Sequence, residues 1–248
     1  MRCNRIARRP EAISNLEAFM LRILLIAFLT FALPSAANAE ISDRAARACE
    51  VSADVIAASR AARPILARFD REASFADRGS GPVRIIEFAD YSCPACRALH
   101  PRWVALARTN PNVRISVVEY PIYGRTLISR ATGNRTLNAS RIAIAAGDQH
   151  KQLAFHDALM GIPGQVNDRA IQLAAQRAGL DLAAAQRLSE SETVTQRADA
   201  NLRLAEQLGF VGTPHVIVDG ILLSLQRGWT LQQVDCLIRS STSRAPMQ

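Results

Sequence analysis

The sequence predicts an α/β fold with an inserted helical subdomain and an N-terminal helical extension. A β-branched run from Val83 leads through the C-P-A-C motif at 93–96 into a helix, and a second apolar strand follows at 112–120. Strand, helix and strand in succession favour a parallel pair. An alanine-rich block at about 129–208 has helical spacing, and a further apolar strand begins at Pro214. The helical block therefore interrupts the sheet.

Composition favours one or two folded domains and gives no sign of nucleic-acid binding. The chain has 248 residues, of which 49% are hydrophobic, so it can bury a sizeable core. Its formal charge of +8 comes almost wholly from arginines, since Lys151 is the lone lysine. These arginines are spread along the chain without a dense basic run or interleaved aromatics beyond the N-terminus. We expect no nucleic-acid partner.

The N-terminal 39 residues have the pattern of a cleaved export signal. Arg22 precedes the apolar run Ile23–Leu33, and Ala37-Asn38-Ala39 forms a small-residue cleavage site. The apolar run is short for a transmembrane helix. We expect cleavage after about Ala39, with translation able to start at Met20. Four cysteines remain in the mature chain, which suits an oxidising compartment: Cys49, Cys93, Cys96 and Cys236.

Residues 40–79 are expected to form the N-terminal helical extension. Ala48, Val51, Val55 and Ile56 recur at helical spacing, which predicts one or two amphipathic helices. These helices can pack on their own domain or pair with a second subunit to form an oligomer. The glycine- and proline-containing stretch at 78–82 then ends the helical pattern.

The two cysteines of the C-P-A-C motif lie at the start of the predicted helix. Proline is tolerated in a first helical turn, so Pro94 fits there. A helical projection places Cys96 on the apolar face and Cys93 at its margin, which predicts an exposed Cys93 and a sheltered Cys96. Free N–H groups at a helix start favour a thiolate, so the pKa of Cys93 should be lowered. Arg97 stands where c-type haem attachment needs histidine, which excludes haem.

A metal site is the alternative function for the same motif. His100 lies one helical turn beyond Cys96, so Cys93, Cys96 and His100 could hold zinc or copper in a metal-tolerance protein. A structural zinc site normally has four ligands, and Cys49 and Cys236 lie singly and far away in the sequence. We therefore expect no bound metal and treat His100 as an ordinary helix residue.

The helical insertion is predicted to contain several consecutive amphipathic helices. Asn167 and Asp181 are suited to cap helix starts, and Gly179 and Gly209 to end helices. The expected helices span 129–147, 149–160, 167–178, 182–189 and 192–208.

The C-terminal part should form a strand hairpin and a last helix. Pro214 opens an apolar strand, and Gly220 permits a turn into a strand over Ile221–Leu225. Thr230 and Gln233 form a capping box for the last helix. Its expected apolar face consists of Leu231, Val234, Leu237 and Ile238, with Cys236 pointing away. Residues 242–248 are expected to be a flexible tail.

Two motifs in combination resemble a known enzyme family. E-F-A-D-Y-S-C-P-A-C at 87–96 and V-G-T-P-H at 211–215, separated by a helical block, resemble the DsbA-like thiol:disulfide oxidoreductases of the thioredoxin superfamily. The likeness covers about residues 80–241. It implies a thioredoxin-like fold and a bacterial periplasmic enzyme that exchanges disulfides with exported proteins. It also implies extended or unfolded protein substrates, a membrane redox partner and no bound cofactor.

The resemblance assigns roles to site residues. Cys93 and Cys96 would be the catalytic pair, with Cys96 resolving the mixed disulfide. Pro214 would follow a cis peptide bond facing the dithiol, and Thr213 would offer backbone hydrogen bonds to substrate. Glu87 would transfer protons near Cys96. An acid within an apolar strand should also have a raised pKa on physical grounds alone.

The sequence does not decide whether the enzyme acts as an oxidase, an isomerase or a reductase, so the direction of net disulfide transfer stays open. Pro94-Ala95, the dipeptide that tunes the redox potential, lacks the histidine of the strongest oxidants in the family. Thr213 resembles the isomerase branches as much as the oxidases. His215 can approach the dithiol or pack in the core.

Cys49 and Cys236 lie in the first and last predicted helices. They can form a structural disulfide within the chain, remain free, or join two subunits. The sequence does not choose among these three arrangements.

Overall fold

The computed structural model describes residues 42–122, 130–224 and 228–243. The expected signal peptide at 1–39, the alternative start at Met20 and the tail from residue 244 onward lie outside the described residues. In the described part of the chain, no helix is both long enough and apolar enough to cross a membrane.

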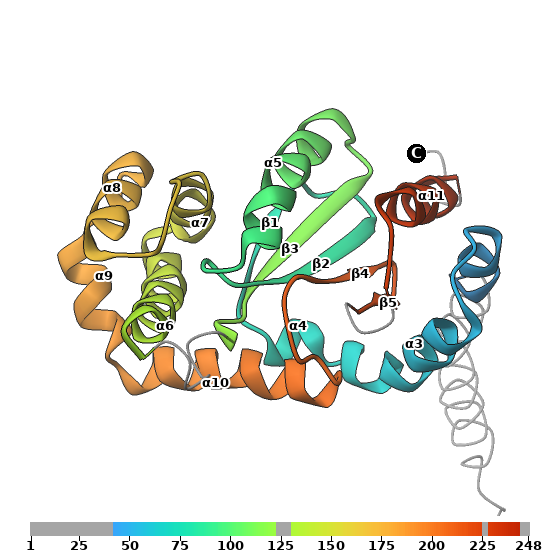
Figure 1. Ribbon diagram of the computed structural model, residues 1–248, viewed down its shortest axis with the longest axis horizontal. Helices are drawn as coiled ribbons and strands as arrows, with labels where there is room; N and C mark the ends of the chain where they lie inside the picture. Colours follow the sequence, from blue (N-terminus) through green and yellow to red (C-terminus); the bar gives the residue numbers. More distant parts are fainter. Residues whose placement is uncertain (1–41, 123–129, 225–227, 244–248) are drawn as a thin grey trace, which may run out of the picture. The chain divides into compact units, whose positions relative to one another are not determined.

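A five-stranded mixed sheet forms the centre of the described fold (Figure 1). The strands lie in the order β1-β3-β2-β4-β5, with β2 and β3 parallel and the other pairs antiparallel. This arrangement confirms the predicted α/β, thioredoxin-like fold and the parallel strand pair. The strands are β1 (Phe75–Arg78), β2 (Val83–Ala89), β3 (Val113–Glu119), β4 (His215–Val218) and β5 (Ile221–Leu223).

Strand β1 was not predicted, since the sequence analysis placed only helices before β2. Its four residues alternate poorly in polarity and are half-buried or exposed. It pairs at the edge of the sheet with β3. A short edge strand of this kind leaves almost no periodic signal in the sequence.

Helices cover both faces of the sheet. As a result, β2 and β3 bury side chains on both sides. Ile85 and Ile115 pack with α5 (Pro94–Thr109) and α11 (Leu231–Thr242). Phe88 and Val118 face the opposite way, toward α10 (Glu192–Gln207), α4 (Phe69–Glu72) and the end of α3 (Ala53–Leu66). Alternation along two neighbouring strands thus produces two separate cores.

The helical insertion follows β3 and has a core of its own. Asn167 and Asp181 cap α8 and α9 through their side chains, and Gly179 ends α8 with a φ of 62°. These predicted caps and stops are confirmed. The helices are α6 (Arg130–Ala145), the 3-10 turn η3 (Ala146–Gln149), α7 (Gln152–Met160), α8 (Asp168–Ala178), α9 (Leu182–Ser189) and α10.

The N-terminal helices pack against their own chain. Residues 42–48 are helical, and Ala46 and Val55 join a core with Ile221 of β5 and Leu237 of α11. Asp43 accepts hydrogen bonds from two arginines of α3 at 2.7 Å each. Packing within the chain is therefore the arrangement found for the described residues.

The last helix has the predicted capping box, in which Thr230 and Gln233 exchange side-chain and backbone hydrogen bonds. Leu231 was expected on the apolar face but is 43% exposed, because it lies in the first turn, beyond the edge of the core. The strand before the helix ends at Leu223 rather than at Leu225, which lies outside the described residues.

Cys49 and Cys236 form a disulfide within the chain. Their Cα atoms lie 5.6 Å apart, and the bond links the end of the first helical segment to α11. Of the three arrangements left open by the sequence, the structure has the intrachain bond. It closes a loop of 187 residues in sequence.

Replacing both Cys49 and Cys236 with serine should lower the free energy of unfolding by about 2–4 kcal/mol, because the unfolded chain loses a long cross-link. Urea unfolding under non-reducing conditions measures this change. Ser240→Ala is a matched control, since Ser240 contacts the Cys49 sulfur without belonging to the bond. An unchanged unfolding midpoint, or alkylation of both cysteines without prior reduction, would contradict the prediction.

Candidate functional site

The dithiol lies at the junction between β2 and α5. Cys93 is the N-cap of α5, and Pro94 occupies the first turn, where a missing N–H costs nothing. The Cys96 backbone N–H donates to Cys93 Sγ at 3.4 Å. Both cysteines are free thiols in the structure.

A loop more than a hundred residues away in sequence lies against the dithiol. The Thr213–Pro214 peptide bond is cis, and Cys93 Sγ donates a hydrogen bond to Thr213 O at 3.2 Å. The antiparallel pairing of β4 with β2, in which His215 lies opposite Phe88, brings this loop to the end of β2. Sheet pairing therefore assembles the site from distant segments.

Cys93 is not the exposed thiol that the helical projection predicted. It is 2% exposed and Cys96 is fully buried. The projection considered α5 alone, whereas the Thr213 carbonyl and the core of the helical insertion also cover Cys93.

The two thiols differ strongly in acidity. Hydrogen bonding from Cys96 lowers the pKa of Cys93 to about 6, although burial acts in the opposite direction. Burial raises the pKa of Cys96 far above its usual value, and its hydrogen bond to Cys93 adds to the effect. The arrangement thus provides one thiolate near neutral pH and one thiol that keeps its proton.

Glu87 is buried on the same face of the sheet as Ile85, with 1% of its surface exposed. Burial raises the pKa of its carboxyl to about 7, while the positive charge of His156 counteracts the rise. Trp103 lies near Glu87, but its indole N–H forms no hydrogen bond of normal geometry within the described residues. A carboxyl with this pKa can both accept and donate a proton at neutral pH.

A buried polar cluster next to the dithiol was missed by the sequence analysis. It consists of Tyr91, Glu119 and His156, each no more than 1% exposed. Glu119 carried the same signal as Glu87, a carboxylate within a β-branched strand. His156 carried no signal, because only the fold brings α7 to this position.

Arg97 was also missed as a structural residue of the site. Its guanidinium donates to the backbone oxygen of Tyr91 at 2.7 Å and to those of Leu159, Met160 and Ile162. The residue after Cys96 therefore ties α5 to the end of α7. Five fixed N–H donors suit arginine to such a cluster of carbonyls.

The predicted metal alternative has no geometric support. Among the described residues, no three histidine, cysteine or acidic side chains gather as ligands, and this includes Cys93, Cys96 and His100. His100 is buried, and its Nε2 lies 3.5 Å from Asp157 Oδ1. His215 stacks on Phe210 with ring centroids 3.9 Å apart and packs in the core.

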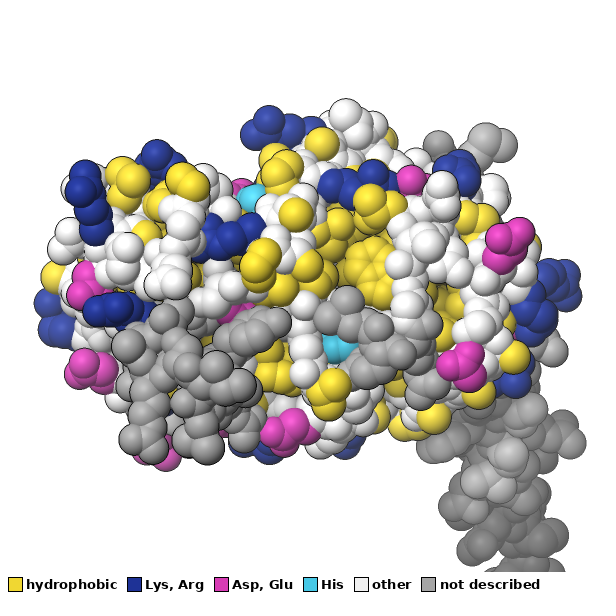
Figure 2. All heavy atoms as spheres, viewed as in Figure 1, with side chains coloured by type: hydrophobic (Ala, Val, Ile, Leu, Met, Phe, Trp, Pro, Cys, Tyr) yellow, Lys and Arg dark blue, Asp and Glu magenta, His cyan; other side chains and the backbone are white. Residues whose placement is uncertain are grey.

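An apolar hollow of about 400 Å³ lies beside the dithiol. Figure 2 shows hydrophobic side chains gathered on this face, in the region between α5 and α11. The hollow is lined by Ala95, Ala98, Leu99, Pro214, Gly228, Trp229 and Leu231. Its position makes it the surface that a molecule bonded to Cys93 would meet.

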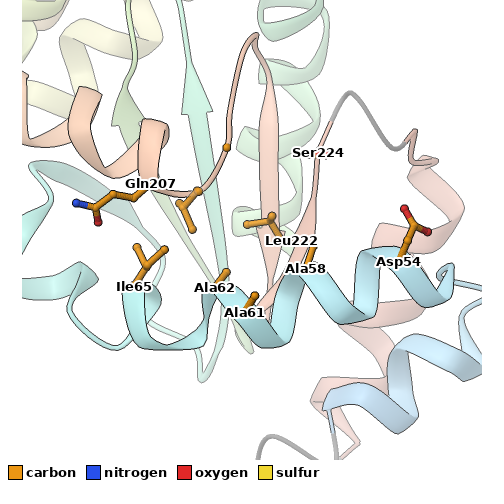
Figure 3. Close-up of a pocket in the computed structure, with 10 residues that line it drawn as sticks. Asp54, Ala58, Ala61, Ala62, Ile65, Gln207, Leu222 and Ser224 are labelled. Atoms are coloured by element: carbon orange, nitrogen blue, oxygen red, sulfur yellow. The ribbon is translucent and has the colours of Figure 1, made fainter.

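A larger cavity of about 790 Å³ lies along α3 (Figure 3). Ala58, Ala61 and Ala62 form one wall, and Gln207 and Leu222 lie across from them. No residue of the dithiol or of the Thr213–Pro214 loop lines it.

Comparison with known proteins identifies the family. The model of the DSBA-like thioredoxin domain matches residues 84–237. No curated protein matches the chain. A thioredoxin-like oxidoreductase from Silicibacter pomeroyi DSS-3 is 33% identical, covering 71% of this chain and 96% of its own, with a TM-score of 0.59.

Two further solved structures share the fold at lower identity. A periplasmic thioredoxin-like protein from Salmonella enterica serovar Typhimurium is 22% identical over 73% of this chain and 97% of its own, with a TM-score of 0.58. The thiol-disulfide exchange protein alpha-DsbA2 from Wolbachia pipientis is 20% identical over 75% of this chain and 97% of its own, also with a TM-score of 0.58. Together with the family match and the geometry of Cys93, Cys96 and Pro214, these findings show that the chain belongs to the DsbA-like thioredoxin domain family of thiol-disulfide oxidoreductases.

Proposed function

We propose that this protein is a periplasmic enzyme that exchanges disulfides with exported proteins through Cys93 and Cys96. The observation that carries the proposal is the asymmetry of the pair: Cys93 has a pKa of about 6 and contacts the Thr213 carbonyl, while Cys96 is buried and keeps its proton. An attacking thiolate and a resolving thiol are the two parts that disulfide exchange requires.

In the reduced enzyme, the Cys93 thiolate attacks a partner disulfide. A bond forms from Cys93 to one partner sulfur, and the other partner sulfur leaves with the electron pair. Cys96 then attacks Cys93, passes its proton to Glu87, and displaces the second partner thiolate. The dithiol becomes oxidised and the partner disulfide reduced, so the sulfurs carry the electrons without a bound cofactor. The reverse sequence transfers a disulfide to substrate.

The substrate we propose is an extended or unfolded protein segment. The cis-proline loop at Thr213–Pro214 presents backbone groups beside Cys93, and the apolar hollow between α5 and α11 accepts hydrophobic side chains. Val211, in the same loop, is 71% exposed and available for contact. Backbone pairing with apolar pockets suits recognition of extended chains of many sequences.

The acidity of Cys93 supports an oxidant of moderate strength. In thioredoxin, a cysteine pKa near 7 accompanies a reduction potential of about −270 mV. In DsbA, a cysteine pKa of about 3.5 accompanies a reduction potential of about −120 mV. Cys93, at about 6, falls between them and nearer to thioredoxin. We propose net disulfide donation or isomerisation, with the direction set by a membrane redox partner.

The export signal at 1–39 supports a periplasmic location, as does the periplasmic relative from Salmonella. An intrachain disulfide between Cys49 and Cys236 also fits an oxidising compartment.

Cys96→Ser should trap a mixed disulfide between Cys93 and an unfolded protein that carries one activated disulfide, because the resolving thiol is gone. Cys93→Ser should form no adduct and lose activity. Non-reducing gels and mass spectrometry measure the adducts. Cys49→Ser with Cys236→Ser is the matched control and should keep exchange activity. An adduct on Cys96 in the Cys93→Ser variant would contradict the assigned roles.

The reduction potential of the Cys93–Cys96 pair should be roughly −230 mV, between the values of thioredoxin and DsbA. Equilibration with glutathione buffers, followed by alkylation and mass spectrometry, measures it. Ala95→His should make the potential less negative, since a cationic neighbour stabilises the Cys93 thiolate. A potential below that of thioredoxin would rule out net oxidation as the task.

A further inference from the structure

The buried cluster of Tyr91, Glu119 and His156 has the geometry of a fixed ion pair. Tyr91 donates its hydroxyl to Glu119 Oε1 at 2.7 Å, and His156 Nδ1 lies 3.0 Å from the same oxygen. The Tyr91 hydroxyl also lies 3.2 Å from His156 Nδ1. Three elements meet here, namely the loop before Cys93, the end of β3, and α7. Oε1 of Glu119 therefore contacts both Tyr91 and His156.

The cluster lies on the same face of the sheet as Glu87. In the parallel register Glu87 pairs with Val117 and Ala89 pairs with Glu119. Side chains two residues apart point to the same face of a strand, so the two glutamates project from neighbouring strands toward the face that α5 covers. A cation beside Glu87 favours its ionised form, whereas the charge of Glu119 raises the pKa of the Glu87 carboxyl.

His156 supplies that cation. Burial alone would lower the pKa of His156, but the hydrogen bond and negative charge of Glu119 outweigh it and raise the pKa. The same positive charge is the main influence that counteracts the raised pKa of Glu87. Charge on His156 is thereby coupled to protonation of Glu87.

The other charged groups around His156 do not supply a second cation to Glu87. His100 of α5 lies with its ring centroid 5.5 Å from that of His156, and burial lowers its pKa to about 4, so it is neutral near pH 7. Asp157, next in sequence, pairs with Arg78 of β1 and lies 3.5 Å from His100.

The cluster and Glu87 also contain buried polar atoms that lack a hydrogen-bond partner. Within the described residues, Glu87 Oε1, Glu119 Oε2 and His156 Nε2 are buried without a hydrogen-bond partner. Most buried polar atoms in folded proteins are paired, so each exception needs an explanation, and a change of protonation is one such explanation. These three atoms belong to groups that share this face, although other buried polar atoms without a partner lie elsewhere in the described residues.

We propose that His156 is a positioning residue for proton transfer, which as an imidazolium held by Glu119 keeps Glu87 able to take the Cys96 proton. This inference rests on the proposed function. When Cys96 attacks Cys93, its proton moves to the Glu87 carboxylate, the new sulfur–sulfur bond forms, and the partner thiolate leaves with the electron pair. Without the imidazolium, Glu87 holds its own proton at neutral pH and the resolving step slows.

The test uses reduced full-length protein and the chromogenic disulfide 5,5′-dithiobis(2-nitrobenzoate) in stopped flow. Attack by Cys93 releases one aryl thiolate, and resolution by Cys96 releases the second. His156→Gln should raise the pH midpoint of the second phase by about one unit, since a nearby cation shifts a carboxyl by about this amount or more. Near pH 7 the second phase should slow by up to about tenfold. The first phase should keep its pH dependence.

His100→Gln is the matched control, because it removes a neighbouring ring that carries no charge at neutral pH. It should leave the midpoint of the second phase in place. Glu87→Gln should remove that pH midpoint altogether. An unchanged second-phase midpoint in folded His156→Gln protein would overturn the proposal.

A measurement on the unmodified protein covers the case in which His156→Gln does not fold. Carbon-13 labelling of the histidine rings reports the charge of each of the four histidines. His156 should be protonated at pH 7 while His100 is neutral, and a neutral His156 would overturn the proposal. If the unmodified protein releases no second aryl thiolate, the dithiol mechanism itself fails, and this inference fails with it.

Discussion

The hydrogen bonds that Cys96 donates to the Cys93 sulfur are the interaction on which the site depends. They exist because Cys93 caps α5, so the chain direction of the helix aims the Cys96 N–H at the sulfur. Burial would otherwise oppose a thiolate at Cys93. The order β3-β2-β4 then adds the second half of the site, since it brings the Thr213 carbonyl to the same sulfur.

The helical insertion belongs to the chemistry as well as to the fold. Cys93 and Cys96 pack in its core, and Arg97 binds the carbonyls at the end of α7. The same helix carries His156 into the polar cluster beside Glu87. One helix that is distant in sequence from the C-P-A-C motif therefore contacts both the dithiol helix and the polar cluster whose charge acts on Glu87.

Local signals predicted most of the fold. The caps Asn167, Asp181 and Thr230 were correct because each acts within one turn of its own helix. Long-range features behaved differently. Strand β1 was missed because four edge residues carry no clear period, and the exposure of Cys93 was predicted wrongly because a single helix cannot reveal what covers it. His156 had no sequence signal, since its contact with Glu119 arises only where α7 meets β3.

The site holds one acidic thiol, Cys93, and one thiol that keeps its proton, Cys96. Thiolate absorbance near 240 nm, followed against pH in the reduced protein, tests this difference most directly. The reduced protein should show a single ionisation near pH 6 that disappears in Cys93→Ser, and no second thiolate until strongly alkaline pH. A midpoint at the ordinary cysteine value, or an ionisation near pH 6 that survives in Cys93→Ser, would contradict it.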